Sequence, residues 1–558
     1  MTEEPFSAEV QEFNLIDEDW IPVIDMKGIE REVSIREALL HAEDFRDITG
    51  ELLTVRFAIL RVLLAIIYRA FDEEIDGEPL QYWGELWREG QLPAELIEPY
   101  LDDWHHRFDL LSPTEPFMQV PTLRTAKDEW KPVDLIVADV DTDKPLFTMR
   151  SELKSLSFSE AARWLIHTNA YDYSGIKSGA VGDERVKGGR GYPMGVGWCG
   201  WLGGVALTGK NLRETLLLNY IAGRTVETPD DLPVWEEPVL PDGERNPKDL
   251  SHVGAVSLMT WPQRRLRLRA GKDQITGVLV SNGDPLDYTM QWTNEVMSGW
   301  RFSQPQTTKA KAVRYMPRTF SAGQALWRGL TTLIPYGESA QLDKKLQEKW
   351  NVKDAAQPAA VVEWLAQLTK YKLIPADYVV EVSAVTMEYG AQMSSYTEVV
   401  SDRLAFAAAL AEITDGGDLL QLAQNAVTRT ERGVRALQYL AQDVDRAAGG
   451  SGESSGVTAS ERAYAEFDQS FRGWLLKVKP GCDGEELLDD WTEHVRKTIR
   501  KRAEALVAEA PPSAWIGRPD GVSGKVLSVP TAMNKFEKNI YYGLGGNTQK
   551  EKDSQNDD

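Results

Sequence analysis

The stretch "FNLIDEDWIPVID", Phe13–Asp25, decides how the chain begins to fold. WIPVID reads as a short strand, MKG with Gly28 as a turn and IEREVS as a second strand, which together predict a β-hairpin. Pro22 predicts that the first strand lies at a sheet edge, because proline has no N–H to donate to a neighbouring strand. Ser34, followed three residues later by Glu37, has the pattern of a capping box and predicts that a helix begins directly after the hairpin.

The bulk composition is that of a large, well-packed protein without a membrane segment. A chain of 558 residues predicts two to four domains, and 42% hydrophobic residues are enough for proper cores. The most apolar run, "FAILRVLLAIIYRAF" from Phe57, contains Arg61 and Arg69, so we expect a buried helix and no membrane contact. Two distant cysteines, Cys199 and Cys482, indicate no disulfide framework and favour a cytoplasmic protein.

The patterning along the chain predicts an α+β fold in which a large mixed N-terminal domain, with short strands, helices and long loops, precedes a four-helix bundle. Residues 1–395 form the mixed domain, with helices over 35–120 and short strands such as RLRLRA after about residue 120. The bundle takes residues 396–512, and PP at 511–512 ends its last helix. The polar tail within 513–558 is expected to be at least partly disordered. The expected bundle helices are 398–413, 419–448, 460–478 and 485–508.

The net charge of −24 limits contact with nucleic acid to a narrow surface or one shared with a partner, because phosphate contacts need Lys and Arg. In QRRLRLR, strand alternation places three arginines on one face, which fits a phosphate backbone as well as it fits a solvated face paired with acids. A second basic segment is KAKAVRYMPR, and a third lies beside the apolar stripe of the last bundle helix, where a solvated face is favoured. The residues are Arg265, Arg267 and Arg269; Lys309, Lys311 and Arg314; and Arg496, Lys497, Arg500 and Lys501.

Signals for catalysis are weak. GVALTGKN, 204–211, is close to a phosphate loop, but Asn211 replaces the Ser or Thr that holds magnesium, and an ordinary strand and turn is favoured. Six histidines in the whole chain make a two-metal site unfavourable, and we expect no metal and no cofactor. Two polar loops stand out instead. YDYSGIKSG, 171–179, has small residues that allow close backbone approach, and EYGAQMSSY, 388–396, presents Gln392 in a tight turn, although a plain turn and a hinge are the simpler interpretations.

An ordered set of segments resembles one known family. NLIDEDWIPV, EPFMQ, GIKSG, NLRETLLLN and EYGAQMSS follow one another as do similar segments in the CasA family, the large subunit of the type I-E Cascade complex. Cascade is an RNA-guided antiviral surveillance assembly. The resemblance covers the chain up to about residue 400, and the expected bundle fits the remainder.

The resemblance implies a non-catalytic subunit that recognises the short protospacer-adjacent motif (PAM) of duplex DNA from the minor groove. It also implies that the subunit begins strand separation and helps to recruit a helicase-nuclease. The PAM loop corresponds to Tyr173, Ser174 and Gly175 with Lys177 beside them, and Ser174 stands where the family usually has glycine. Gln392 matches a glutamine wedge that parts the first base step.

The implied partners are CRISPR RNA, the other Cascade subunits, double-stranded target DNA and the helicase-nuclease. A loop containing Phe147, Thr148 and Met149 is expected to reach the neighbouring subunit and the RNA. Two alternatives stay open from the residues alone: a nucleotide-dependent enzyme that uses GVALTGKN, and a purely structural scaffold.

Overall fold

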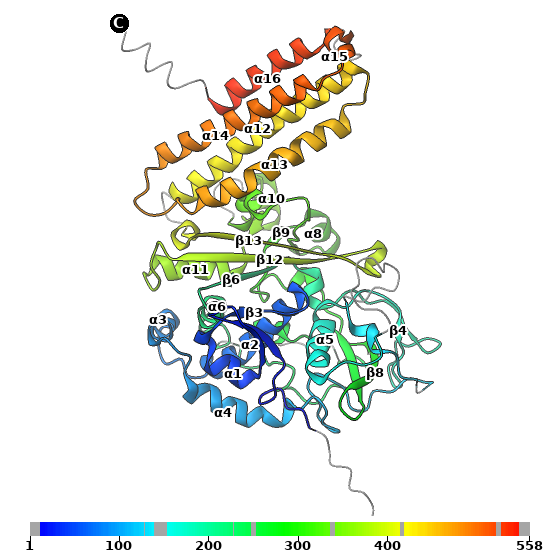
Figure 1. Cartoon of the computed structure of the whole chain (residues 1–558). Helices are drawn as coiled ribbons and strands as arrows, with labels where there is room; N and C mark the ends of the chain where they lie inside the picture. Colours follow the sequence, from blue (N-terminus) through cyan, green and yellow to red (C-terminus); the bar gives the residue numbers. More distant parts are fainter. Residues whose placement is uncertain are drawn as a thin grey trace, which may run out of the picture. The chain divides into compact units, whose positions relative to one another are not determined.

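The computed structural model describes residues 12–127, 129–138, 153–226, 228–246, 253–334, 341–412, 418–519 and 526–545. The chain divides into two compact units. Unit 1 has short strands, helices and long loops, and unit 2 is mainly helical (Figure 1), which confirms the α+β fold class. Unit 1 comprises Met1–Ala322, Pro335–Leu368 and Glu381–Arg403, and unit 2 comprises Gly323–Ile334, Thr369–Val380 and Leu404–Asp558. Two short segments from before residue 395 therefore belong to the helical unit.

The opening hairpin forms as the sequence predicts. β1 (Ile21–Asp25) pairs antiparallel with β2 (Glu30–Val33), and α1 (Ile35–Leu40) follows at once. The hydroxyl of Ser34 accepts a hydrogen bond from the amide of Glu37 at 3.1 Å, so one free N–H of the first helical turn is satisfied. In the acidic run before the hairpin, Asp17 accepts a hydrogen bond from Arg36 of α1 at 3.0 Å, so this part of the run serves the fold.

The prediction that Pro22 marks an edge strand is wrong. β1 is the central strand of a three-stranded sheet, with β2 on one side and β3 (Phe45–Ile48) on the other. Val23 pairs with Ile48, the last residue of β3, and the amide of Thr49 donates to the carbonyl of Pro22 at 2.8 Å. Pro22 thus faces Thr49, one residue past the end of β3, so its missing N–H lies where this pairing stops and not within it.

The apolar run from Phe57 lies in α2 (Leu53–Asp72), a helix buried on nearly all sides. Inside it, the guanidinium of Arg61 donates to both carboxylate oxygens of Glu295, at 2.8 and 2.9 Å. Burial alone would raise the pKa of Glu295, but the charge of Arg61 and hydrogen bonds from Arg61, Trp198 and the Met297 amide hold that pKa below its ordinary value. None of the described helices is long and apolar enough to cross a membrane.

A long hairpin replaces the first expected bundle helix. β12 (Val379–Tyr389) and β13 (Tyr396–Ala407) join β6 (Gly204–Thr208) in a sheet of order β13-β12-β6. A helix over 398–413 is therefore wrong as far as residue 407. Within β13, Val400, Leu404 and Phe406 are buried at even spacing, which is the period of a strand, and Ala407 at its last position is buried as well.

Within unit 1, α2 contacts α4, α5, α6 and α7, and further hairpins and helices complete the unit. Its other hairpins are β4 (Lys177–Ser178) with β5 (Arg190–Gly191) and β7 (Arg264–Ala270) with β8 (Ile275–Asn282). A further sheet has the order β10 (Tyr315–Pro317), β9 (Trp300–Phe302), β11 (Ala356–Gln357). The other helices are α3 (Pro79–Glu89), α4 (Ala94–Trp104), α5 (Phe158–Tyr171), α6 (Leu212–Asn219), α7 (Ala255–Met259), α8 (Gln304–Ala310), α10 (Lys344–Trp350) and most of α11 (Ala360–Lys370).

Unit 2 is built around α12 (Asp418–Ala448), which contacts each of the other long helices. α13 (Glu453–Leu475) and α14 (Gly484–Ala508) lie where the sequence predicts helices. α15 (Pro512–Ile516) and the hairpin of β14 (Arg518–Pro519) with β15 (Val526–Leu527) follow, and α9 (Leu330–Leu333) also belongs to this unit.

The fourth bundle helix comes from the segment that was expected to be a tail. α16 (Val529–Leu544) buries residues at helical spacing and packs on α12 and α14. The four-helix bundle is thus α12, α13, α14 and α16, and the expected membership of 398–413 is replaced by 529–544. The polar end, 546–558, lies outside the described residues. The buried positions of α16 are Val529, Ala532, Phe536, Ile540 and Leu544.

Removing one partner of the buried ion pair between Arg61 of α2 and Glu295 should destabilise unit 1. In Glu295→Ala the charge of Arg61 remains buried without a carboxylate, which costs about 3–5 kcal/mol in comparable pairs. Denaturant unfolding measures the loss. Glu30→Ala, at an exposed position of β2, is the control and should change stability by less than about 0.5 kcal/mol. Equal effects of the two substitutions would contradict a structural role for the pair.

Candidate functional site: a hairpin tip on a small-residue loop

Gln392 lies at the exposed tip of the β12–β13 hairpin. The turn is closed by the Gly390 amide, which donates to the Ser395 carbonyl at 2.9 Å, and by the Met393 amide, which donates to the Gly390 carbonyl at 2.9 Å. Gln392 has φ of +55° and Met393 has φ of +57°. Residues other than glycine rarely adopt this left-handed region, so the tip holds two side chains in a conformation that glycine would adopt more easily.

The second polar loop lies directly against this tip. The amide of Ser174 donates to the carbonyl of Met393 at 2.7 Å. The ring of Tyr173 meets that of Tyr396 edge-on, with centroids 5.4 Å apart, and the hydroxyl of Tyr389 donates to the Tyr171 carbonyl at 2.6 Å. The structure therefore brings together two segments that the sequence marked separately and that lie more than 200 residues apart.

Ser174 needs no glycine-like backbone, because its φ is not positive. Glycine is required one residue later. A Cβ atom on Gly175 would lie 2.8 Å from a ring carbon of Tyr173, so the loop is packed tightly onto that ring. Tyr173, Ser174 and Gly175 are half-buried, whereas Ile176 is 57% exposed. Ile176 was not among the predicted site residues, and its exposure follows from the burial of Lys177 next to it, which only the structure shows.

Lys177 does not lie on the surface, which corrects its expected role as a DNA contact. Its side chain is 3% exposed, and its ammonium lies 2.7 Å from Asp172 Oδ2 and 3.8 Å from the centroid of the Tyr173 ring. Arg264 Nε lies 2.5 Å from the same carboxylate oxygen. Burial would raise the pKa of Asp172, but the charges and hydrogen bonds of Lys177 and Arg264 outweigh it and hold the pKa below its ordinary value.

The predicted row of arginines on β7 is wrong for Arg265. That side chain is fully buried, and its guanidinium lies 2.7 Å from Asp284 and donates to the carbonyls of Pro241 and Gly243. β7 enters the core at its first residues and leaves it at its last, so burial changes along the strand. Arg267 and Arg269 extend outward, and both lie over the ring of Trp130, at 5.5 and 5.7 Å from its centroid.

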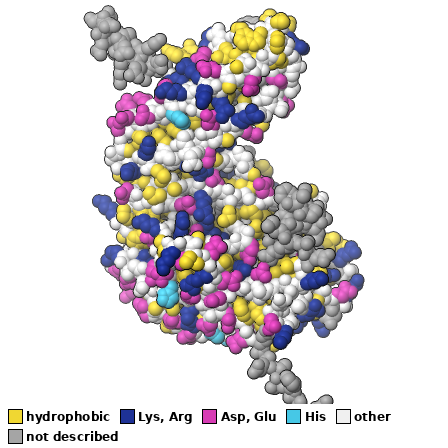
Figure 2. Space-filling model, in the orientation of Figure 1, with side chains coloured by type: hydrophobic (Ala, Val, Ile, Leu, Met, Phe, Trp, Pro, Cys, Tyr) yellow, Lys and Arg dark blue, Asp and Glu magenta, His cyan; other side chains and the backbone are white. Residues whose placement is uncertain are grey.

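The second basic segment is on the surface. Lys309, near the end of α8, and Lys311, its C-cap, are exposed, and neither has an acidic partner within salt-bridge distance among the described residues. Arg314 is half-buried and donates to the carbonyl of Val313. On the face drawn in Figure 2, cationic side chains are interspersed with acidic ones and do not gather in one stripe. Contact with DNA through this segment would be local.

The third basic segment is partly used within the bundle, which corrects the expectation for two of its residues. Arg496 donates to the carbonyl of Leu544 at the end of α16, and Arg500 lies 2.8 Å from Glu537 on α16. Lys497 is exposed beside Glu493, and Lys501 is exposed without an ion pair to any described residue. The predicted loop residues Phe147, Thr148 and Met149 lie outside the described residues.

The near phosphate loop has the expected strand, turn and helix, but its donors are occupied. The amide of Lys210 donates to Glu214 Oε2 at 2.7 Å, and the amide of Gly209 donates to Thr215 Oγ1 at 3.0 Å. Asn211 caps α6 by accepting from the Glu214 amide. A carboxylate therefore lies where a phosphate loop presents free N–H groups, which disfavours a nucleotide there.

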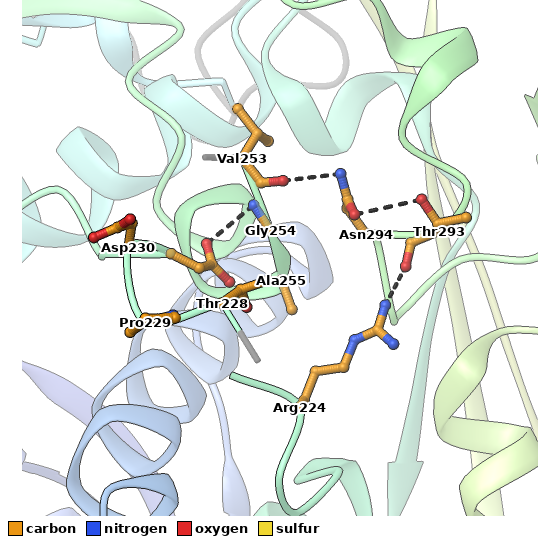
Figure 3. Close-up of a pocket in the computed structure, with 10 residues that line it drawn as sticks. Arg224, Thr228, Pro229, Asp230, Val253, Gly254, Ala255, Thr293 and Asn294 are labelled. Carbon is orange, nitrogen blue, oxygen red and sulfur yellow. Dashed lines mark hydrogen bonds between the residues drawn. The ribbon is translucent and has the colours of Figure 1, made fainter. Parts of the chain in front are cut away.

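A polar surface pocket of about 420 Å³ is shown in Figure 3. Its polar groups are engaged with the chain itself. Arg224 donates to the Thr293 carbonyl and Asn294 donates to that of Val253, while Asp231 accepts from the amides that begin α7. Among the described residues, no group of three or more His, Cys, Asp or Glu is placed to hold a metal ion.

The comparisons with known proteins agree with this fold. The family model "CRISPR-associated protein Cse1" matches residues 14–501. The chain belongs to the Cse1 family of CRISPR-associated proteins.

Individual relatives cover the chain to different extents. CRISPR-associated protein CasA/Cse1 of Thermus thermophilus is 32% identical over 293 residues, 50% of this chain and 54% of the relative, so the match spans about half the length of that curated protein. The crystal structure of Thermobifida fusca Cse1 is similar over 97% of this chain and 99% of that one, with 37% identity and a TM-score of 0.86. Cse1 from Acidimicrobium ferrooxidans covers 96% and 98%, with 25% identity and a TM-score of 0.79.

Acid should destabilise the packing behind the site through His167, which stacks on Tyr171. Burial lowers the pKa of His167 from 6.5 to about 3, so between these values the unfolded chain binds a proton that the folded chain does not. Stability from this group is full above pH 6.5 and is lost on acidification.

Urea unfolding at two pH values tests this expectation. Between about pH 7 and about pH 5, the native chain should lose about 2 kcal/mol more stability than His167→Phe, which has no titrating ring. Equal losses in both proteins would contradict a neutral, buried imidazole.

Proposed function

We propose that this chain is the non-catalytic large subunit of a Cascade-type, RNA-guided antiviral DNA surveillance complex. In this role it recognises the PAM in duplex DNA from the minor groove, starts strand separation and helps to recruit a helicase-nuclease. Its partners are the CRISPR RNA, neighbouring Cascade subunits and double-stranded target DNA. The observation that carries the proposal is the 2.7 Å hydrogen bond from the Ser174 amide to the Met393 carbonyl, which joins the PAM loop to the turn that presents Gln392.

The chemistry of the minor groove suits such a site. The groove is only about 6 Å wide and offers a degenerate pattern of acceptors, so small residues and backbone groups fit it better than long side chains do. Ser174 and Gly175 supply a slim loop, packed on Tyr173 and not free to collapse. Readout of this kind would tolerate several related PAM sequences.

Gln392 fits the role of a wedge. Its amide carries both donors and acceptors, so it can replace hydrogen bonds of a base pair that it displaces. Parting the first base step costs a few kcal/mol, which contacts elsewhere must offset. The tip is already held in its left-handed turn before DNA arrives, so no ordering of the turn adds to that cost.

Phosphate contacts are assigned to the exposed cations. Lys309 and Lys311 have no acidic partner among the described residues and can approach a DNA backbone without breaking an ion pair. Arg267, Arg269, Lys497 and Lys501 are further surface cations. A chain with a net charge of −24 would then hold DNA at limited points and leave most of the nucleic acid to its partners.

The rival enzymatic function makes a separate claim about Lys210. If GVALTGKN held a nucleotide, native protein would bind ATP and Lys210→Ala would not. We expect no binding by either, because Glu214 and Thr215 already occupy the donors of the turn.

Gln392→Ala should slow the opening of duplex target by the assembled complex by about tenfold, the loss of one good base-pair contact. Binding to a target whose first bases are already unpaired should change little, because no base step remains to be parted. Fluorescence of a 2-aminopurine beside the PAM measures opening, and a filter assay measures binding. Gln81→Ala, at an exposed position of α3, is the matched control. Equal loss on both DNA substrates would contradict a wedge, and unchanged opening would favour a scaffold.

Replacing Lys309 and Lys311 together by Met should weaken binding of all DNA sequences alike. If each lysine contacts one phosphate, the slope of log K against log salt becomes shallower by about 0.9 per lysine. Titrations at several salt concentrations give the slope. Lys27→Met, in the exposed β1–β2 turn, should leave it unchanged. An unaltered slope in the double variant would show that this segment is only solvated.

A further inference from the structure

We propose that Lys177 is a positioning residue of the DNA site: together with Asp172 and Arg264 it fixes the PAM loop to the hairpin tip, so that the loop and Gln392 act as one rigid element. The proposal rests on the proposed function and goes beyond it, because it removes the loop's lysine from DNA contact and gives it a mechanical role.

The ammonium of Lys177 is committed inside the protein. It lies 2.9 Å from Asp172 Oδ1 and 2.7 Å from Oδ2, and both side chains are 3% exposed. A lysine that contacts phosphate keeps its ammonium in water until DNA arrives. Here, moving it outward would break its contacts with both carboxylate oxygens of Asp172 and with the Tyr173 ring, and would leave Arg264 as the remaining cation of the cluster.

Arg264 extends the cluster to the backbone around the loop. Its guanidinium donates to the carbonyl of Tyr173 at 3.1 Å and to that of Gly195 at 2.8 Å, in addition to Asp172. The backbone of Asp172 is fixed as well, because its amide donates to Thr168 in α5. Both ends of the segment from Asp172 to Lys177 are therefore held, one through α5 and one through the ion pair.

The Tyr173 ring transmits this constraint to the hairpin. One face of the ring lies under the Lys177 ammonium, at 3.8 Å, and the ring meets Tyr396 of β13 edge-on. Gly175 packs so closely on the same ring that a Cβ atom would collide with it. Ser174 then bonds to Met393, beside Gln392. Loosening Lys177 should therefore displace the wedge as well as the loop.

Two mechanisms for Lys177 differ in a measurable way. As a phosphate contact, its loss would make the salt slope of DNA binding shallower by about 0.9 and would add to the effect of Gln392→Ala. If Lys177 is a positioning residue, its loss leaves the salt slope of DNA binding unchanged and slows duplex opening by about tenfold. In a protein that already carries Gln392→Ala, loss of Lys177 slows opening by less than a further factor of about two, because both changes disable the same tip.

The test uses Lys177→Met, Gln392→Ala and the double variant in the complete complex with its RNA, with opening and salt-dependent binding measured as above. Lys27→Met is the control for a lost surface charge. Tyr173→Leu is the second variant, since it breaks the link to Tyr396 without altering a buried charge and remains informative if Lys177→Met does not assemble. We expect Tyr173→Leu to slow opening with an unchanged salt slope.

The outcomes separate the inference from the function on which it rests. If Gln392→Ala slows opening but Lys177→Met makes the slope shallower and acts additively, the positioning role is wrong and the wedge stands. Full-speed opening by Tyr173→Leu overturns the positioning role as well. If Gln392→Ala has no effect on opening, the proposed function itself fails.

Discussion

The buried carboxylate of Asp172 is the constraint on which the candidate site depends. It sits at the end of α5 and receives Lys177 from the loop and Arg264 from the start of β7. Arg264, 92 residues from Asp172 in the sequence, must therefore reach the end of α5, and the loop must turn back so that Lys177 meets the same carboxylate. A buried ion cluster of this kind contributes little net stability compared with apolar packing, but an arrangement without Asp172 would leave two buried cations uncompensated and is strongly disfavoured. Its value here lies in specifying a geometry.

The β12–β13 hairpin rests on this geometry and exposes the side chain of Gln392 at its tip. Its strands have 11 and 12 residues, which is longer than the usual length of about 3–10 residues for strands in globular proteins. Away from the tip, β12 pairs with β6 from Glu381 to Val385. The tip is exposed, β12 below it is largely buried, and β13 exposes Thr397 and Glu398 beside the tip before it becomes buried further along. Rigid support and a solvated end are the conditions under which a single polar residue can be aimed at a partner with little loss of conformational entropy. The left-handed backbone at Gln392 is tolerated because the closing hydrogen bonds of the turn determine it.

The sequence correctly predicts the elements that depend on local periodicity. It gives wrong predictions where contacts between residues distant in the sequence determine the structure. The helices at α12, α13 and α14 have clear apolar stripes, and the hairpin before α1 has its turn and cap. β13 was mistaken for a helix because its valines and leucine also suit a helical spacing, and only pairing with β12 selects the strand. Burial of Arg265 depends on Asp284, a pairing that no local pattern shows. Lys177 pairs with Asp172, only five residues before it, but the buried site that takes both is completed by Arg264, 92 residues from Asp172. The tip and the loop were each recognised, but their contact at Ser174 was not, because a backbone hydrogen bond carries no residue signature.

The hydrogen bond from Ser174 to Met393 determines which residues position 174 can accept. Its donor is a main-chain N–H, which every amino acid except proline possesses. Serine, glycine or alanine at position 174 can therefore make the same hydrogen bond to Met393. A comparison of amino-acid sequences alone would not reveal that the position matters. Chains with other residues at position 174 can therefore keep the same backbone connection between the loop and the hairpin tip.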